Sequence, residues 1–246
     1  MSGQAGPRRF FEVIGEDPAC RLSPYCWRIR MALAHKGLSF EPQPWRITEK
    51  HRIAASGGIT APVLVDGRRW LRDSWKIALY LEETYPAHPL MAGPAALSRC
   101  RFLNSWADGT LHPALFRAVI AEQFPLTAEI DKAYYLERTL MKFGQSVEQI
   151  GADPDPAAAL VSNALVPVED ALSLAPYLGG DAPDYGDYIL FGTFQWARVV
   201  SRRHFWPQGS ALERWFDALL DAFDGMGRAQ PPRAHWDLPP LTCLAR

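Results

Sequence analysis

The stretch that decides the fold reads Leu22-Ser23-Pro24-Tyr25-Cys26-Trp27-Arg28-Ile29-Arg30. It follows a short β-rich run at residues 10–14 and leads into an apolar run that ends near Lys36. Ser23 has an N-cap oxygen and Pro24 suits the first helical position, so the pattern predicts a helix that begins here. The positive end of a helix, with its unpaired N–H groups, can hold an anion such as a thiolate. Ser23 therefore either caps the helix only or also presents its hydroxyl to a bound anion.

The composition is typical of a folded globular protein. The chain has 246 residues, of which 48% are hydrophobic and 22% are charged, enough for one large domain or two smaller ones. With a net charge of -1, the chain lacks the excess of positive charge that is typical of proteins that bind nucleic acid or an anionic membrane surface. We see neither a signal peptide nor an apolar run of about 18 residues, so we expect a cytoplasmic protein with no nucleic-acid or membrane partner.

The cysteines and histidines do not form a metal motif. The four cysteines contain no C-x-x-C pair, and none lies at metal-ligand spacing with the six scattered histidines. We therefore expect no metal site and a reducing compartment.

The first third of the chain alternates strand and helix signals. We predict strands at 10–14 and 38–44, a helix at 24–36 and a short helix at 46–55. Strands at 59–67 and 70–72 follow, joined by the hairpin signal Asp66-Gly67, and then a helix at 73–85. The order β-α-β-α-β-β-α is that of a thioredoxin-like α/β domain, which we place at residues 1–86.

Beyond a proline-rich linker at 86–94, helical periodicity dominates, and we predict an all-helical domain at 95–246. Helices are expected near 97–122, 127–150, 157–175, 184–201 and 210–227. Asp184 and Asp187 form a capping box at the start of the fourth of these. The tail from Gln230 to Arg246 contains four prolines, and we expect it to lie extended over the surface.

With this organisation the chain resembles the cytosolic glutathione S-transferases over nearly its whole length. Four motifs carry the resemblance, in the family's order and separation: Ser23-Pro24-Tyr25-Cys26, Ala61-Pro62-Val63-Leu64, Asp73-Ser74 with the apolar helix that follows, and the Asp184–Asp187 box. Within the family the chain is similar to the bacterial β-aryl-etherase-like branch with its fungal relatives. That branch often has Glu-Ser where this chain has Asp73-Ser74.

The resemblance implies glutathione as co-substrate and assigns a role to each matching residue. Ser23 would donate its hydroxyl hydrogen bond to the glutathione sulfur. The remaining glutathione contacts would be Ala61 before a cis-Pro62 for the cysteinyl part, Asp73 and Ser74 for the γ-glutamyl part, and Lys50, with Arg46 as helper, for the glycyl carboxylate. The thiolate is the nucleophile in such chemistry, so one serine at a helix start suffices and no metal is required.

The second substrate would be a small hydrophobic, aromatic electrophile, with aryl-ether cleavage as a more specific version. We expect it between Tyr25 and the first helix of the helical domain, where Trp106, Phe116 and Arg117 are candidates. Aromatic residues at helical spacing can equally be core. The resemblance also implies a homodimer.

Two alternative functions stay open. The chain could be a binding or scaffold protein that kept the fold without turnover, since fold does not guarantee function. It could also be a thiol oxidoreductase that uses Cys26, because Ser-x-x-Cys differs from the redox motif Cys-x-x-Cys by one residue.

Overall fold

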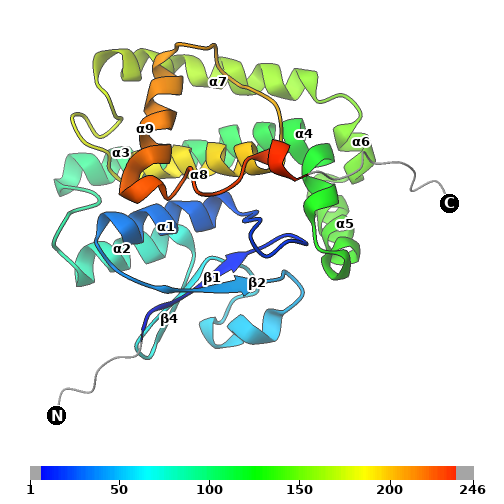
Figure 1. Ribbon diagram of the computed structural model, residues 1–246, viewed down its shortest axis with the longest axis horizontal. Coiled ribbons are helices and arrows are strands. Elements are labelled where there is room, and N and C mark those ends of the chain that lie inside the picture. Colours follow the sequence, from blue (N-terminus) through cyan, green and yellow to red (C-terminus); the bar gives the residue numbers. More distant parts are fainter. Residues whose placement is uncertain (1–6, 237–246) are drawn as a thin grey trace.

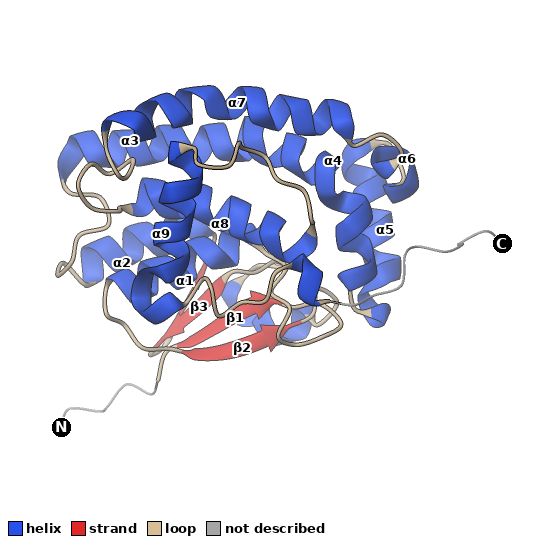
Figure 2. Cartoon of the chain, turned by 45° about the horizontal axis from the view of Figure 1, so that its top comes forward, coloured by secondary structure: helices blue, strands red, loops and turns tan. Residues whose placement is uncertain are grey.

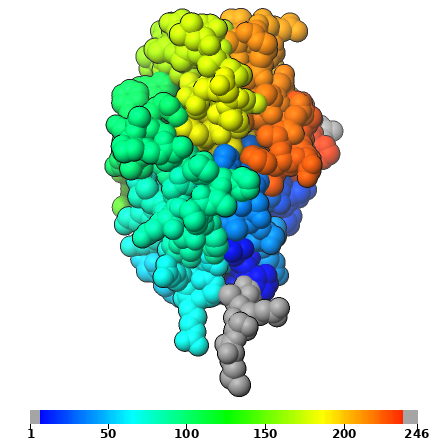
Figure 3. Space-filling view, turned by 90° about the vertical axis from the view of Figure 1, so that its left-hand side faces the viewer, coloured from blue at the N-terminus to red at the C-terminus, as the bar shows by residue number. Residues whose placement is uncertain are grey.

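The computed structural model describes residues 7–236. A small sheet lies at one side of the molecule, helices α1 and α2 cover one of its faces, and the remaining helices are stacked beyond them (Figures 1 and 2). Figure 3 shows the same arrangement from the side, with the helical part (green to orange) above the first part (blue to cyan). The predicted α/β thioredoxin-like domain followed by a helical domain is confirmed.

The sheet has four strands in the order β2-β1-β3-β4. They are β1 (Arg9–Val13), β2 (Glu41–Trp45), β3 (Val63–Asp66) and β4 (Arg69–Arg72). β1 runs parallel to β2 and antiparallel to β3, and β3 and β4 form the predicted hairpin. The side chains of Phe11, Val63 and Val65 form a small core on one face with Trp45 and Ile53.

The second strand differs from its prediction at residues 38–44. It runs from Glu41 to Trp45 and includes Pro42 and Pro44, which we expected to end it. β2 is an edge strand, and a proline can occupy an edge strand where its missing N–H would face outward.

Three helical elements complete the first domain. They are α1 (Pro24–His35), the 3₁₀ helix Lys50–Ser56 and α2 (Ser74–Thr84). α1 is apolar on most sides because it is enclosed between the sheet and the helical domain, and Trp27, Ile29 and Met31 are all at most 2% exposed.

The helical domain contains α3 (Gly93–Trp106), α4 (His112–Gln123), α5 (Glu129–Phe143), α6 (Val147–Gly151), α7 (Asp155–Leu174), α8 (Tyr185–Val200) and α9 (Ala211–Gly225), with short 3₁₀ helices at Phe124–Leu126 and Arg233–His235. A π-helical turn, Ala107–Leu111, joins α3 to α4. The predicted helix at 127–150 is two helices, because Gly144 ends α5 with φ of 67° and Ser146 begins α6 with a capping box.

The described part of the tail is packed, not extended over the surface as predicted. Gln230 and Trp236 are 2% and 7% exposed, and Arg198 donates a hydrogen bond to the Gln230 carbonyl over 2.8 Å. Residues 237–246 of the predicted tail lie outside the described residues.

Among residues 7–236, α7 is the one helix that is long and apolar enough to cross a membrane by length and composition. It packs against α4 and α9 through one face, and the buried residues on that face are Ala157, Val161, Leu165, Val168 and Leu172.

The contact between α1 and α8 fixes the start of α1 against the helical domain. Gly192 on α8 allows this close approach, because a Cβ there would lie 2.6 Å from the Pro24 carbonyl oxygen. Trp196 follows one turn later on the same helix. The sequence therefore brings an α8 side chain next to the loop that carries Ser23.

Candidate functional site

Ser23 occupies the N-cap of α1, as predicted, and is 5% exposed. Its Oγ accepts a hydrogen bond from the backbone N–H of Cys26 over 3.2 Å. The preceding backbone is fixed by a 3.0 Å hydrogen bond from the Leu22 N–H to the Val13 carbonyl. Since the oxygen accepts from the helix, the hydroxyl hydrogen stays available to an acceptor beyond the start of the helix.

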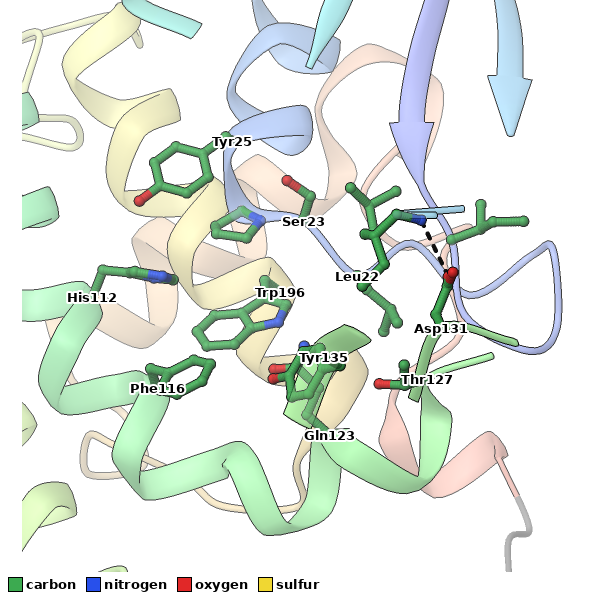
Figure 4. A pocket seen from close by; sticks show the side chains of 14 residues that line it. Leu22, Ser23, Tyr25, His112, Phe116, Gln123, Thr127, Asp131, Tyr135 and Trp196 are labelled. Atoms are coloured by element: carbon green, nitrogen blue, oxygen red, sulfur yellow. Dashed lines mark hydrogen bonds between the residues drawn. The ribbon is translucent and has the colours of Figure 1, made fainter. Parts of the chain in front are cut away.

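A cavity of about 200 Å³, here the small cavity, lies beside Ser23 (Figure 4). The loop before α1, the α4–α5 region and α8 all contribute to its wall. The residues labelled in Figure 4 are Leu22, Ser23, Tyr25, His112, Phe116, Gln123, Thr127, Asp131, Tyr135 and Trp196. Aromatic rings form much of the lining, and burial lowers the pKa of His112 to about 3, so its imidazole is neutral at pH 7.

A second cavity of about 1190 Å³, here the large cavity, contains four residues of the glutathione prediction. Ala61 and Pro62 line it, and the peptide bond between them is cis, as predicted. Asp73 lines it as the N-cap of α2, with its Oδ1 accepting from the Lys76 N–H over 3.0 Å. Ser74 is the first residue of α2, where unpaired N–H groups favour a carboxylate.

Charged side chains of both signs line the large cavity. Arg72, Lys76 and Arg101 are cationic, and Asp73 and Asp108 are acidic. Such a mixture suits a ligand that carries carboxylates and an ammonium group together.

Tyr25 lines both cavities and therefore lies where they adjoin. Its ring is 4.6 Å from the Arg28 guanidinium carbon and 5.5 Å from the His112 ring. Burial is the main cause that raises the pKa of its phenol. The predicted contact residue Tyr25 is thus in place for a ligand in either cavity.

Lys50 and Arg46 are not among the residues that line these two cavities. The Lys50 Nζ lies 4.0 Å from the centre of the Tyr134 ring. The Arg46 guanidinium donates to the Gly15 carbonyl over 3.5 Å and lies 3.9 Å from the Glu16 carboxylate. The structure does not bring either side chain to Asp73 and Ser74.

Only one of the three candidates from the helical domain lines the small cavity. Phe116 lines the small cavity. Trp106, at the end of α3, lines a different cavity of about 450 Å³. Arg117 donates to the Gln145 side chain over 3.0 Å and lies over the Phe143 ring. Trp106 lies before the π-helical turn and Phe116 and Arg117 lie after it.

Cys26 is fully buried, and burial raises the pKa of its thiol to about 12. A thiol in this state supplies neither an accessible sulfur nor a thiolate at neutral pH. The structure therefore gives no support to the oxidoreductase hypothesis. Among residues 7–236, no group of three or more His, Cys, Asp or Glu side chains is placed to hold a metal ion.

Sequence reasoning missed the Arg28–Asp108 pair beneath the large cavity. Arg28 on α1 is fully buried and donates to Asp108 over 2.8 Å and to Asn104 over 3.2 Å. The dipeptide Asp108-Gly109 inside the predicted helix at 97–122 was a signal, since both residues disfavour a helix interior. It marks the π-helical turn, a feature frequent at functional sites.

The structure is a thioredoxin-like domain joined to an all-helical domain, with two cavities where they meet. A model of the glutathione S-transferase N-terminal domain matches residues 18–89, and a model of the glutathione S-transferase C-terminal domain matches residues 100–223. The chain belongs to the glutathione S-transferase family, whose co-substrate is glutathione.

Curated relatives match a limited part of the chain. A zeta-class glutathione S-transferase of Euphorbia esula is 38% identical over 72 residues, which are 26% of this chain and 31% of that protein. Glutathione S-transferase Z1 of Arabidopsis thaliana is 39% identical over 71 residues, again 26% of this chain and 31% of that protein. The chain thus matches about a third of the length of these curated relatives.

Solved structures match nearly the whole chain at low identity. Glutathione transferase GSTFuA3 from Phanerochaete chrysosporium superposes with a TM-score of 0.79 at 20% identity, covering 88% of this chain and 97% of that one. A glutathione S-transferase of Ceriporiopsis subvermispora in complex with glutathione has a TM-score of 0.74 at 20% identity, covering 90% and 99%. At this identity the likeness establishes a shared fold.

Proposed function

We propose that this chain is a glutathione transferase in which Ser23 donates a hydrogen bond to the sulfur of bound glutathione and stabilises its thiolate. One observation carries the proposal: the buried Ser23 hydroxyl caps α1 beside the small cavity, and its oxygen already accepts from the Cys26 N–H. The hydroxyl hydrogen can therefore rotate to an acceptor in the cavity. A sulfur that accepts this hydrogen also meets the positive end of α1.

The magnitudes are sufficient for this role. A free thiol has a pKa of about 8.5, and lowering it by about two units requires roughly 2.7 kcal/mol of selective thiolate stabilisation. A hydrogen bond to a charged group contributes about 1.5 to 3 kcal/mol, and a helix terminus about 0.3 to 1 kcal/mol. One serine at one helix start can thus stabilise the nucleophilic thiolate, and the enzyme must in addition position that thiolate against the second substrate.

Glutathione would lie in the large cavity with its sulfur toward Ser23. The backbone of Ala61 beside cis-Pro62 would pair with the cysteinyl part, and Asp73 and Ser74 would hold the γ-glutamyl end. For the glycyl carboxylate the prediction was Lys50 with Arg46. Lys50 lies on the Tyr134 ring, and a shift of its flexible side chain would be needed to reach the ligand.

The second substrate would lie in the small cavity, where its aromatic lining supports an aromatic electrophile. Thiolate attack that displaces a phenolate is the more specific version, and it would use the same nucleophile. A homodimer and a cytoplasmic location stay predictions from the resemblance and the composition, and light scattering of the purified chain tests the first.

The decisive experiment is the ultraviolet difference spectrum of bound glutathione across pH, for wild type, Ser23→Ala and Ser23→Thr. In the wild type we expect a thiolate band that titrates about two units below the free-thiol pKa. Ser23→Ala should restore a nearly free pKa while glutathione still binds. Ser23→Thr keeps both the hydroxyl and the N-cap, so it is the matched control and should retain the shift.

Two results would contradict the proposal. Glutathione that does not bind would favour the scaffold alternative, in which the motif is present without turnover. Glutathione that binds with an unshifted thiol would remove Ser23 from the mechanism. If the thiolate is found, aryl ethers are the first electrophiles to screen.

A further inference from the structure

Five buried polar atoms of the small cavity have no hydrogen-bond partner among residues 7–236. They are His112 Nδ1, Gln123 Oε1, Thr127 Oγ1, Tyr135 Oη and Trp196 Nε1. In the described part of the chain eleven such atoms occur, so nearly half of them gather at this one cavity. Most buried polar groups in proteins are paired, and a cluster of unpaired ones therefore points to a ligand.

The unpaired groups belong to buried side chains from separate elements of the fold. Trp196, Thr127 and Gln123 are 1%, 4% and 6% exposed, and they come from α8, the segment before α5, and α4. In Figure 4 they gather with Tyr135 around one space below Ser23, and the Thr127 hydroxyl points into that space. Donors and one acceptor thus surround the same volume, because an indole N–H donates, an amide oxygen accepts and a hydroxyl does either.

The lining of the small cavity carries one anionic side chain and no cationic one. Its one carboxylate, Asp131, accepts hydrogen bonds from the N–H groups of Ile47 and Thr48 over 3.2 and 3.1 Å and from the Thr48 hydroxyl over 2.6 Å. His112 is uncharged at neutral pH, and neither Lys nor Arg is among the lining residues. An anionic ligand would enter without a counter-charge, which is unfavourable in a buried site, and the one carboxylate is already engaged by its three donors.

The size of the cavity admits one ring. Its volume is about 200 Å³. An apolar cavity of about 150 Å³ accommodates benzene, so a single substituted ring fits. The rings of Phe116, Tyr135 and Trp196 provide apolar surface for such a ring.

We propose that the second substrate is a small, uncharged, single-ring aromatic compound that carries oxygen substituents, with a carbonyl that accepts from Trp196 and Thr127 and a hydroxyl that donates to Gln123. This inference rests on the proposed function, since it names the substrate class of the same site. The proposed compound differs from a purely hydrophobic electrophile, because it pairs three of the five buried groups and an apolar ligand would pair none.

Three unreactive ring compounds of similar shape test the proposal by isothermal titration calorimetry on the full chain, with and without saturating glutathione. The probe is 3-hydroxyacetophenone, its apolar counterpart is 3-ethyltoluene, and its charged counterpart is 3-hydroxybenzoate. We expect the hydroxyketone to bind at least about tenfold more tightly than either counterpart, as one or two additional buried hydrogen bonds imply.

Variants connect the preference to the named groups. Thr127→Val removes one donor with little change of shape, and it should weaken hydroxyketone binding by about threefold to tenfold while leaving 3-ethyltoluene binding unchanged. Phe116→Leu is the matched control, since it trims apolar surface only and should weaken both compounds alike. Thermal melts monitored by circular dichroism verify that each variant is folded.

The outcomes for the two proposals are separable. Equal affinity for the hydroxyketone and 3-ethyltoluene, tightest binding of 3-hydroxybenzoate, or no binding of any probe would each overturn the inference about the substrate, whatever glutathione does. Glutathione that fails to bind, while the hydroxyketone preference and its loss in Thr127→Val are observed, would overturn the transferase proposal and leave the ligand class supported.

Discussion

The Arg28 guanidinium on α1 donates a 2.8 Å hydrogen bond to the Asp108 carboxylate in the π-helical turn of the helical domain. Arg28 is fully buried, whereas the Asp108 side chain is 35% exposed toward the large cavity. The pair therefore joins the two domains directly under the predicted glutathione site. A buried cation depends on its partner, because the charge without that partner stays desolvated.

Replacing Asp108 with alanine should lower the free energy of unfolding by about 3 kcal/mol. Breaking a buried ion pair costs about 3 to 5 kcal/mol, and we expect the lower value because Asp108 is partly exposed. Asp108→Asn should lose less, since an oxygen still accepts from Arg28. Urea denaturation measures both. The exposed Asp181→Ala is the control, and a loss below about 0.5 kcal/mol for Asp108→Ala would show that the pair does not stabilise the domain contact.

Asp73 has φ of 72° and ψ of 122°, a conformation that is unusual for a residue other than glycine. Asparagine tolerates positive φ and keeps the oxygen that accepts from the Lys76 N–H, so Asp73→Asn removes only the charge. If Asp73 holds the glutathione ammonium, glutathione affinity should fall about tenfold, with unfolding free energy unchanged within about 0.5 kcal/mol. Calorimetric titration with glutathione decides this, and wild-type affinity in the variant would remove Asp73 from the binding site.

The parts of the site that could be predicted are those with local sequence signals. The Ser23 cap, the Asp184–Asp187 box and the hairpin at Asp66-Gly67 each depend on residues close in the chain, so spacing alone identified them. The cis bond before Pro62 came from the family resemblance, and the structure confirms it.

The wall of the small cavity could not be predicted in this way. Gln123, Thr127 and Trp196 come together only because α1, α4 and α8 pack on one another. Trp196 is one of nine tryptophans, and nothing in its neighbours distinguishes it from a core residue. Trp106 shows the converse, because it was a candidate on the same predicted helix as Phe116 and it lines another cavity.

His112 should make folding sensitive to acid. Burial lowers its pKa to about 3 in the folded chain, below an unfolded value of about 6.5. Between these values the unfolded chain binds a proton that the folded chain does not, so unfolding free energy falls as pH decreases through 6.5. From pH 7 to pH 5 this contribution is about 2 kcal/mol.

The test compares urea unfolding at these two pH values for wild type, His112→Gln and the exposed His204→Gln. His112→Gln should lose about 2 kcal/mol less than wild type on acidification, and His204→Gln should follow wild type. Parallel losses in all three proteins would show that the pKa of His112 is not lowered by folding, so that its imidazole gains a proton near pH 6.5 in the folded chain as well.

Asp187 should stabilise the contact between the loop before α8 and α9 in addition to the start of α8. Its buried carboxylate accepts from the N–H groups of Leu178, Gly179 and Asp184 over 2.8, 3.0 and 3.0 Å, and from Trp215 Nε1 on α9 over 2.8 Å. Asp187→Asn has the same shape but turns an N–H₂ group toward some of these donors, so about 3 kcal/mol of unfolding free energy should be lost. Hydrogen exchange at the Leu178 and Gly179 amides should become faster.

The matched control is Asp184→Ser, which retains an N-cap oxygen for α8 and should cost less than about 1 kcal/mol. A larger loss for Asp187→Asn than for this control would mean that the carboxylate joins the loop before α8 to α9 in addition to closing the capping box. Equal losses would mean that Asp187 acts only at the helix start, and that the Trp215 contact adds nothing measurable to the stability of the helical domain.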